Sequence, residues 1–241
     1  MATFVLVPGA WHGGWCWRKV TPLLEAHGHR VYTPTLTGVG ERAHLLTREV
    51  NLTTHIQDVV ALILHEDLHD VVLAGHSYGG LVISFVARHA TGRLSHVAYL
   101  DALLPVPGRS PRITDSDPLV ASANASGDGW KIPVPQVTDG ELMGVTDQAD
   151  IKWMLERLTP HPLATFKEVL ELDSREPYPV AGSYALCNGA GREDIELTAH
   201  ADRARELGWP VDEINTGHDL MITEPEETAA FLLRSLAGQP G

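Results

Sequence analysis

The stretch LAGHSYGGL (73–81) places a serine between two glycines, in the pentapeptide GHSYG (75–79). This G-x-S-x-G pattern is typical of a strained turn that joins a strand to a helix and exposes a nucleophilic serine. A run that predicts a strand, DVVLA (70–74), precedes the motif, and an apolar helical pattern follows it. An ordinary serine in a glycine-rich turn is the alternative, but this setting favours Ser77 as a nucleophile.

Two backbone N–H groups are candidates to bind a developing oxyanion beside that serine. Ser77 is expected at the start of a helix, where N–H groups and the helix dipole favour negative charge, so we expect one donor from Tyr78. The loop PGAWHGGW (8–15) follows the first predicted strand, and its glycines allow the backbone to approach a substrate closely. We expect the second donor to be the N–H of Ala10. A tight turn with an anchoring tryptophan is the alternative for this loop.

A serine hydroxyl needs a general base, and His218 is the candidate among 13 histidines. It lies in NTGHDLMITEP (215–225), after the last predicted strand and before the last predicted helix. That place in the order of elements puts it at the same sheet edge as Ser77. Trp11 and His12, from the first loop, are expected to line a substrate pocket. No histidine pair with H-x-x-x-H or H-E-x-x-H spacing is accompanied by further ligands, so we expect neither a metal nor another cofactor.

Asp101 ends an otherwise apolar run in HVAYLDALLP (96–105). A buried charge costs free energy unless it is paired, so this carboxylate is expected to have a partner. A catalytic acid and a carboxylate that caps a helix or anchors a loop are the two interpretations.

Short apolar runs alternate with helical patterns in the first and last thirds of the chain. Strands are predicted over 3–9, 29–35, 70–75, 94–100, 182–188 and 210–216. Helices are predicted over 15–28, 54–68, 78–92, 147–158, 162–172, 193–207 and 225–238. This order is typical of an α/β fold with a mostly parallel sheet that helices flank on both faces.

The alternation lapses over 105–180, where Pro, Ser, Asp and Gly are frequent. A structureless loop of that length is uncommon, so we predict a helical cap over 105–180, inserted between core segments 1–104 and 181–241. Trp130 and Trp153 are candidates for the apolar face that a cap presents to a substrate. Aromatic residues at such spacings also suit core packing, which is the alternative for both.

The chain of 241 residues carries a formal net charge of -13. So acidic a surface repels nucleic acid and anionic membranes, and neither is an expected partner. Cys16 and Cys187 are far apart, which suggests a reducing compartment. Without a membrane-length apolar stretch or a basic signal region, the sequence favours a cytoplasmic protein. A homodimer is compatible with the sequence, which does not fix the oligomeric state.

Three stretches together resemble a known group of proteins: VPGAWHGGWCWRKVTPLLEAHGHRVYTPTLTGVGERAHL (7–45), DVVLAGHSYGG (70–80) and GHDLMITEPEE (217–227). The resemblance is to the α/β-hydrolase group of plant hydroxynitrile lyases, plant methyl esterases and bacterial esterase-like homologues. It covers the two predicted sheet segments well and the middle of the chain weakly. It implies a helical cap over an apolar pocket, a Ser-His-Asp triad and an oxyanion hole, with the matching residues Ser77, His218, Ala10 and Tyr78.

Two positions depart from the plant enzymes. The lyases carry a lysine directly after the catalytic histidine, and this chain has Asp219 there, which disfavours cyanohydrin chemistry. The plant enzymes carry their acid in a CTED-like segment, and the corresponding CNGAGRED (187–194) has Ala190 at that place.

The acid is therefore expected elsewhere. The end of the strand after the nucleophile helix is a second place from which this fold can aim an acid, and cofactor-free dioxygenases of the fold look similar there. We predict that Asp101 pairs with His218, orients its ring and stabilises the imidazolium. Asp194 is the next candidate, and Glu193 follows it.

These features predict a serine esterase that cleaves a small to medium, uncharged, hydrophobic carboxylic ester, thioester or lactone through an acyl-enzyme. Three alternatives stay open at this point: a hydroxynitrile-lyase-like enzyme, a cofactor-free oxygenase, and a non-catalytic receptor for a small ligand.

Overall fold

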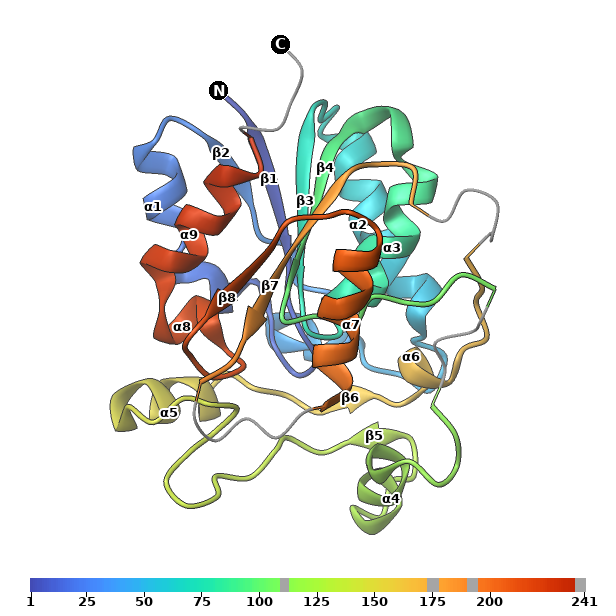
Figure 1. Ribbon diagram of the computed structural model, residues 1–241. Helices are drawn as coiled ribbons and strands as arrows, with labels where there is room; N and C mark the ends of the chain where they lie inside the picture. The colour runs from blue at the N-terminus through green and yellow to red at the C-terminus, as the bar shows by residue number, and fades with distance from the viewer. Residues whose placement is uncertain (109–112, 173–177, 190–194, 237–241) are drawn as a thin grey trace.

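Six parallel strands form one sheet in the order β2-β1-β3-β4-β7-β8 (Figure 1). The computed structural model describes residues 1–108, 113–172, 178–189 and 195–236. The strands are β1 (Thr3–Val7), β2 (Arg30–Tyr32), β3 (Val71–His76), β4 (Leu94–Leu100), β7 (Gly182–Cys187) and β8 (Val211–Ile214). The predicted α/β class with a parallel sheet is therefore confirmed.

Side chains alternate between the two faces of the sheet, because successive residues of a strand point in opposite directions. In β1, Phe4 and Leu6 belong to one core cluster, whereas Val5 and Val7 belong to the other. Helices cover both faces (Figure 1). The first cluster takes in α1 (Thr21–Ala26) and α9 (Pro225–Arg234), and the second takes in α2 (Leu52–His65), α3 (Gly79–His89) and α7 (Ile195–Glu206). Burial on both faces explains why the strands are continuous apolar runs.

The helix predicted over 15–28 is divided in two. A 3₁₀ segment, η1 (Gly14–Lys19), comes first, and α1 follows with Pro22 in its first turn. Proline has no N–H to donate and is tolerated at the start of a helix but not in its interior. The prediction of one continuous helix was therefore wrong at this point.

The segment between β4 and β7 lies at the carboxyl end of the strands, at the bottom of Figure 1. Its described elements are α4 (Pro118–Ala125), β5 (Lys131–Ile132), α5 (Gln148–Leu155), β6 (His161–Pro162) and α6 (Ala164–Lys167). β5 and β6 pair antiparallel with one another, apart from the main sheet. In place of the single helix predicted over 162–172, the chain forms the end of β6 and the short helix α6. The boundaries of core and cap, 1–104, 105–180 and 181–241, stay predictions.

Three further short elements join the larger ones: η2 (Gly40–Leu45), η3 (Thr91–Arg93) and α8 (Leu220–Thr223). None of the helices in the described part of the chain combines the length and the apolar character that crossing a membrane requires.

Candidate active site

Ser77 occupies the turn between β3 and α3 with a φ of +53°. This left-handed conformation is uncommon for a residue with a side chain and persists only where neighbouring contacts fix it. The Ser77 N–H donates to the Leu100 carbonyl at 3.2 Å, and the Ser77 carbonyl accepts from the N–H of Leu103 at 3.0 Å. The end of β4 and the chain beyond it therefore hold the strained turn in place.

The two glycines of the motif are required by close backbone contacts. A Cβ on Gly75 would lie 2.6 Å from the Gly79 carbonyl oxygen, and a Cβ on Gly79 would lie 2.8 Å from the Pro8 carbonyl oxygen. Both distances are too short for real side chains, so only glycine lets the turn pack against the loop after β1.

Asp101 occupies the equivalent place after the neighbouring strand. His76 and Leu100, the last residues of β3 and β4, are partners in the sheet register, so Ser77 and Asp101 both follow directly. Asp101 also has a positive φ, +47°, and its N–H donates to the Ala185 carbonyl at 2.7 Å. The residues that directly follow these two parallel strands thus both have a positive φ. One of them carries a hydroxyl and the other a carboxylate.

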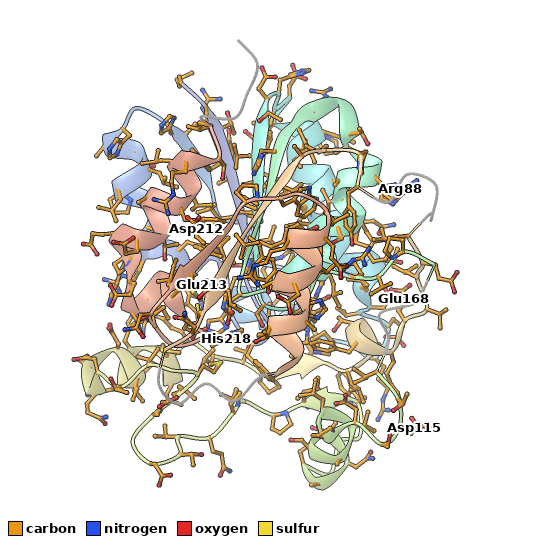
Figure 2. All side chains as sticks on the ribbon, viewed as in Figure 1. Arg88, Asp115, Glu168, Asp212, Glu213 and His218 are labelled. Atoms are coloured by element: carbon orange, nitrogen blue, oxygen red, sulfur yellow. The ribbon has the colours of Figure 1, made fainter. Side chains whose placement is uncertain are left out.

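The Asp101 carboxylate contacts His218. Its Oδ2 lies 2.6 Å from His218 Nδ1, and its Oδ1 accepts the Cys187 N–H at 3.1 Å. Asp101 is fully buried, whereas the His218 side chain is 24% exposed at the sheet end that faces the segment between β4 and β7 (Figure 2). A carboxylate that accepts at Nδ1 fixes the tautomer, so Nε2 is the nitrogen that can exchange a proton. The predicted pairing is present in the structure, and its catalytic role remains a prediction.

The loop after β1 passes close to the serine. A Cβ on Gly9 would lie 3.0 Å from Ser77 Cβ, so the backbone beside Ala10 approaches the nucleophile directly. The Ala10 carbonyl accepts from His12 Nδ1 at 2.8 Å, and the Trp11 N–H donates to His161 Nδ1 at 3.3 Å. Trp11 has a positive φ of +66°, which these two hydrogen bonds hold.

His12, a predicted pocket residue, is only 1% exposed. Its Nε2 lies 3.1 Å from Oδ2 of Asp219, which is fully buried. Both ring nitrogens of His12 are therefore engaged by the protein and do not face a substrate as free polar groups. Burial acts to raise the pKa of the Asp219 carboxyl, but His12, His76 and His218 act against it and lower that pKa.

His76, the last residue of β3, lies beside His218, the predicted base. Its Nε2–H donates to the His218 carbonyl at 2.9 Å, and the two rings are 4.6 Å apart. Burial, followed by the neighbouring His218, lowers the pKa of His76 to about 3, so the ring is neutral. No local pattern points to this contact, because it joins residues that are 142 positions apart.

Two further buried histidines support the site from the other side. His55 on α2 donates from Nε2 to the Thr37 carbonyl at 2.8 Å, and its Nδ1 accepts from the Tyr78 hydroxyl at 2.9 Å. Burial lowers the pKa of His55 to about 4. His161 lies between Tyr78 and Trp11, and burial lowers its pKa well below the ordinary value. Neither histidine carries a motif that sequence analysis could have used.

The aromatic candidates from the middle segment contact cationic side chains. The Trp130 ring lies 5.2 Å from the guanidinium of Arg48 and 5.1 Å from the Lys131 ammonium. The Trp153 ring lies 4.9 Å from the Arg18 guanidinium and 5.0 Å from the Trp15 ring. The assignment of both tryptophans to the substrate pocket stays a prediction.

Histidine and carboxylate atoms cluster at one place in the described part of the chain: His76, His218 and Asp219 offer ligand atoms within 4.8 Å of one another. Hydrogen bonds account for this group, because His76 uses Nε2 for the His218 carbonyl and His218 uses Nδ1 for Asp101.

The segment HEDLH (65–69) has the letters of a zinc motif, but α2 ends at His65, so its two histidines do not share a helix face. The alternative acids Glu193 and Asp194 lie outside the described residues.

A family model described as the alpha/beta hydrolase family matches residues 4–231. The carbendazim hydrolyzing esterase of Nocardioides sp. (strain SG-4G) is 39% identical, over 96% of this chain and 98% of that protein. The pFDCC methylesterase MES16 of Arabidopsis thaliana is 27% identical, over 97% of this chain and 94% of that protein.

A solved structure of an extracellular alpha/beta-hydrolase from a Paenibacillus species superposes with a TM-score of 0.83 at 25% identity. It covers 98% of this chain and 99% of that chain, and it is described as sharing structural and functional homology with tobacco salicylic acid binding protein 2. The predicted resemblance and the predicted esterase class are confirmed at this level, since the relatives named above are esterases or hydrolases of this fold. The chain belongs to the alpha/beta hydrolase family.

Proposed function

We propose that this chain hydrolyses a small to medium, uncharged, hydrophobic carboxylic ester through an acyl-enzyme on Ser77. The observation that carries the proposal is the 2.6 Å contact between buried Asp101 and His218 at the sheet edge where Ser77 begins α3. This arrangement fits the Ser-His-Asp triad, in which the acid holds the imidazole in one tautomer.

His218 takes the Ser77 proton at Nε2 as the hydroxyl attacks the ester carbonyl, and returns it to the departing alcohol. Water then attacks the acyl-enzyme with the same base. Asp101 stabilises the imidazolium that forms in both steps. The N–H groups of Ala10 and Tyr78 bind the oxyanion, which the close approach of the first loop to Ser77 and the helix start at Gly79 both support.

The names of the relatives guide the choice of substrate. They include a methylesterase and an esterase that hydrolyses carbendazim, which favours a small leaving alcohol on an uncharged molecule. Trp11, Trp130 and Trp153 remain candidates for the pocket that receives the acyl part.

A panel of p-nitrophenyl esters of increasing chain length, with carbendazim and a methyl ester added, tests the proposal. Ser77→Ala should lower kcat by up to about 10⁶-fold, as loss of a triad serine does elsewhere. Ser116→Ala, an exposed serine outside the sheet, is the matched control and should behave as wild type. Turnover that survives Ser77→Ala would exclude the acyl-enzyme mechanism.

The cytoplasmic location is part of the same proposal. Cys16 and Cys187 are both buried thiols, which agrees with a reducing compartment. A homodimer is compatible with the sequence, and size-exclusion chromatography with light scattering measures the oligomeric state.

A further inference from the structure

The peptide group between Ala10 and Trp11 is held at both of its polar atoms by buried histidines. His12 Nδ1 donates to the Ala10 carbonyl at 2.8 Å, and the Trp11 N–H donates to His161 Nδ1 at 3.3 Å. The N–H of Ala10 belongs to the peptide group just before. Its direction therefore depends on how firmly the next peptide is clamped.

Proton counting assigns a charge to His12. A carbonyl oxygen can only accept, so Nδ1 must carry a hydrogen. Nε2 faces Asp219 Oδ2 at 3.1 Å, and an ionised carboxylate can also only accept, so Nε2 carries a hydrogen as well. With 1% of His12 and none of Asp219 exposed, the imidazole and the carboxyl group face one another away from water.

His161 is in the opposite state. Its Nδ1 accepts from Trp11, so Nε2 carries the hydrogen and lies 3.0 Å from Thr165 Oγ1. The Thr165 hydroxyl donates to the Pro162 carbonyl at 2.8 Å and can accept from His161. One of the two histidines thus faces a carboxyl group, and the other is a neutral ring that faces a hydroxyl.

We propose that Asp219 is a positioning residue for the oxyanion loop: it keeps His12 doubly protonated, and the His12 cation fixes the Ala10 end of the clamped peptide. This inference rests on the proposed esterase function only for its kinetic consequence. The protonation state of His12 is a separate property of the fold.

The pair also links two loops that are far apart in the sequence. His12 belongs to the loop after β1, and Asp219 follows the proposed base directly, 207 positions later. Asp219 lies 3.6 Å from His76 Nε2, which donates to the His218 carbonyl. Four titratable groups on four other parts of the chain face the pair, and they are Cys16 on η1, His76 on β3, His161 on β6 and the base His218.

The first experiment measures the proton state directly and needs no turnover. Long-range proton–nitrogen NMR of the ¹⁵N-histidine-labelled Ser77→Ala protein should show a hydrogen on both ring nitrogens of His12 at about pH 8. The His12→Gln variant identifies its signals. Asp219→Asn should convert His12 to the neutral form that carries its hydrogen on Nδ1.

Asp67→Asn is the matched control, because Asp67 contacts His69 at 3.3 Å on the surface. It should leave the His12 signals unchanged. A neutral His12 at about pH 8 in the Ser77→Ala protein, with Asp219 unchanged, would overturn the proposal, because the proton would then lie on Asp219. That spectrum decides the question even where Asp219→Asn folds poorly.

The second experiment is kinetic. Asp219→Asn should lower kcat by about 10- to 100-fold with KM close to wild type, since misplacing an oxyanion donor affects the transition state more than the bound substrate. The ratio of wild-type to variant rates should be largest at a pH where the NMR spectrum shows two hydrogens on His12, and should shrink where the spectrum shows one, because His12 is then neutral in both proteins. A residue that only packs the core would give a ratio independent of pH.

The two experiments separate the possible failures. Absence of esterase turnover in every protein, with His12 still doubly protonated, refutes the proposed function and leaves the charge assignment intact. Full activity in Asp219→Asn with a neutral His12 refutes the positioning role alone.

Discussion

Buried histidines surround the site in two settings that differ in one respect. On one side, His218 and His12 each face a fully buried carboxylate, Asp101 and Asp219. On the other side, the hydrogen-bond partners of His55 and His161 are neutral: a carbonyl, hydroxyls and a backbone N–H.

Burial alone does not decide the charge of these rings. Desolvation disfavours the imidazolium, and it lowers the pKa of His55 to about 4 and the pKa of His161 well below its usual value. A buried carboxylate acts against that effect by favouring the charged form. The balance differs from ring to ring, since His76 lies 3.6 Å from Asp219 and burial still lowers its pKa to about 3.

The largest effect is expected from breaking a carboxylate pair at the base. Asp101→Asn should lower kcat/KM for p-nitrophenyl esters by about 10⁴-fold, because the amide does not stabilise the imidazolium and allows the wrong tautomer. The fold should survive, since the amide oxygen can still accept the Cys187 N–H.

Asp212→Asn, at a surface pair with Arg234, is the control for that change. A loss of less than about tenfold in Asp101→Asn would show that another group orients His218. Equal effects at both aspartates would point to general destabilisation.

The neutral histidines should make the protein sensitive to acid. His96 on β4 bonds Ser183 Oγ at 2.9 Å, and burial lowers the pKa of His96 to about 4. Unfolding restores a pKa of about 6.5, so the unfolded chain binds more protons and the free energy of unfolding falls as pH drops from about 6.5 to about 4. Urea titrations should show His96→Gln losing about 1 kcal/mol less than wild type between about pH 6 and pH 5.

His89→Gln, at an exposed position on the end of α3, is the matched control and should keep the wild-type slope. An unchanged slope in His96→Gln would mean that this ring takes up its proton equally in the folded and unfolded chain.

A smaller effect is expected where the clamp is neutral. His161→Gln should lower kcat by about tenfold, because the Trp11 N–H loses its ring acceptor and the loop is held less firmly. The pH profile should keep its shape, since His161 carries no charge in the working range. A profile that changes shape would show that His161 titrates and would erase the distinction between the two settings.

The smallest effect is expected at an aspartate–histidine pair on the surface. Asp67 and His69 are both exposed, and an ion pair in water contributes little. Asp67→Asn should leave kcat/KM unchanged and Tm nearly so. A marked loss of activity would contradict the view that burial gives the His–Asp pairs their importance.

The residues of the site could be predicted where a local pattern requires them. Gly75 and Gly79 flank Ser77 because a backbone carbonyl occupies the space that a side chain would need at each position. Such a turn can be predicted from the five-residue motif. Asp101 was a candidate because a buried charge at the end of an apolar strand needs a partner. His218 was a candidate because it follows the last predicted strand.

The support of the site was not predictable in the same way. The sequence assigned Asp219 no partner and predicted that His12 lines a pocket, yet the two side chains contact one another in the interior. The helix predicted over 15–28 is divided ahead of Pro22. Of the helix predicted over 162–172, only Ala164–Lys167 is helical, since Pro162 pairs with β5 instead.

Local residue patterns were enough to predict the parallel sheet, through apolar runs that are buried on both faces, and the turn at Ser77, through its glycines. Which histidines face a carboxylate depends on contacts that only the folded chain makes. The contacts that fix their protons join residues 117, 150 and 207 positions apart, namely His218 with Asp101, Trp11 with His161 and His12 with Asp219. Folding creates both the burial and the partner of each ring, and neither is written in the residues next to it.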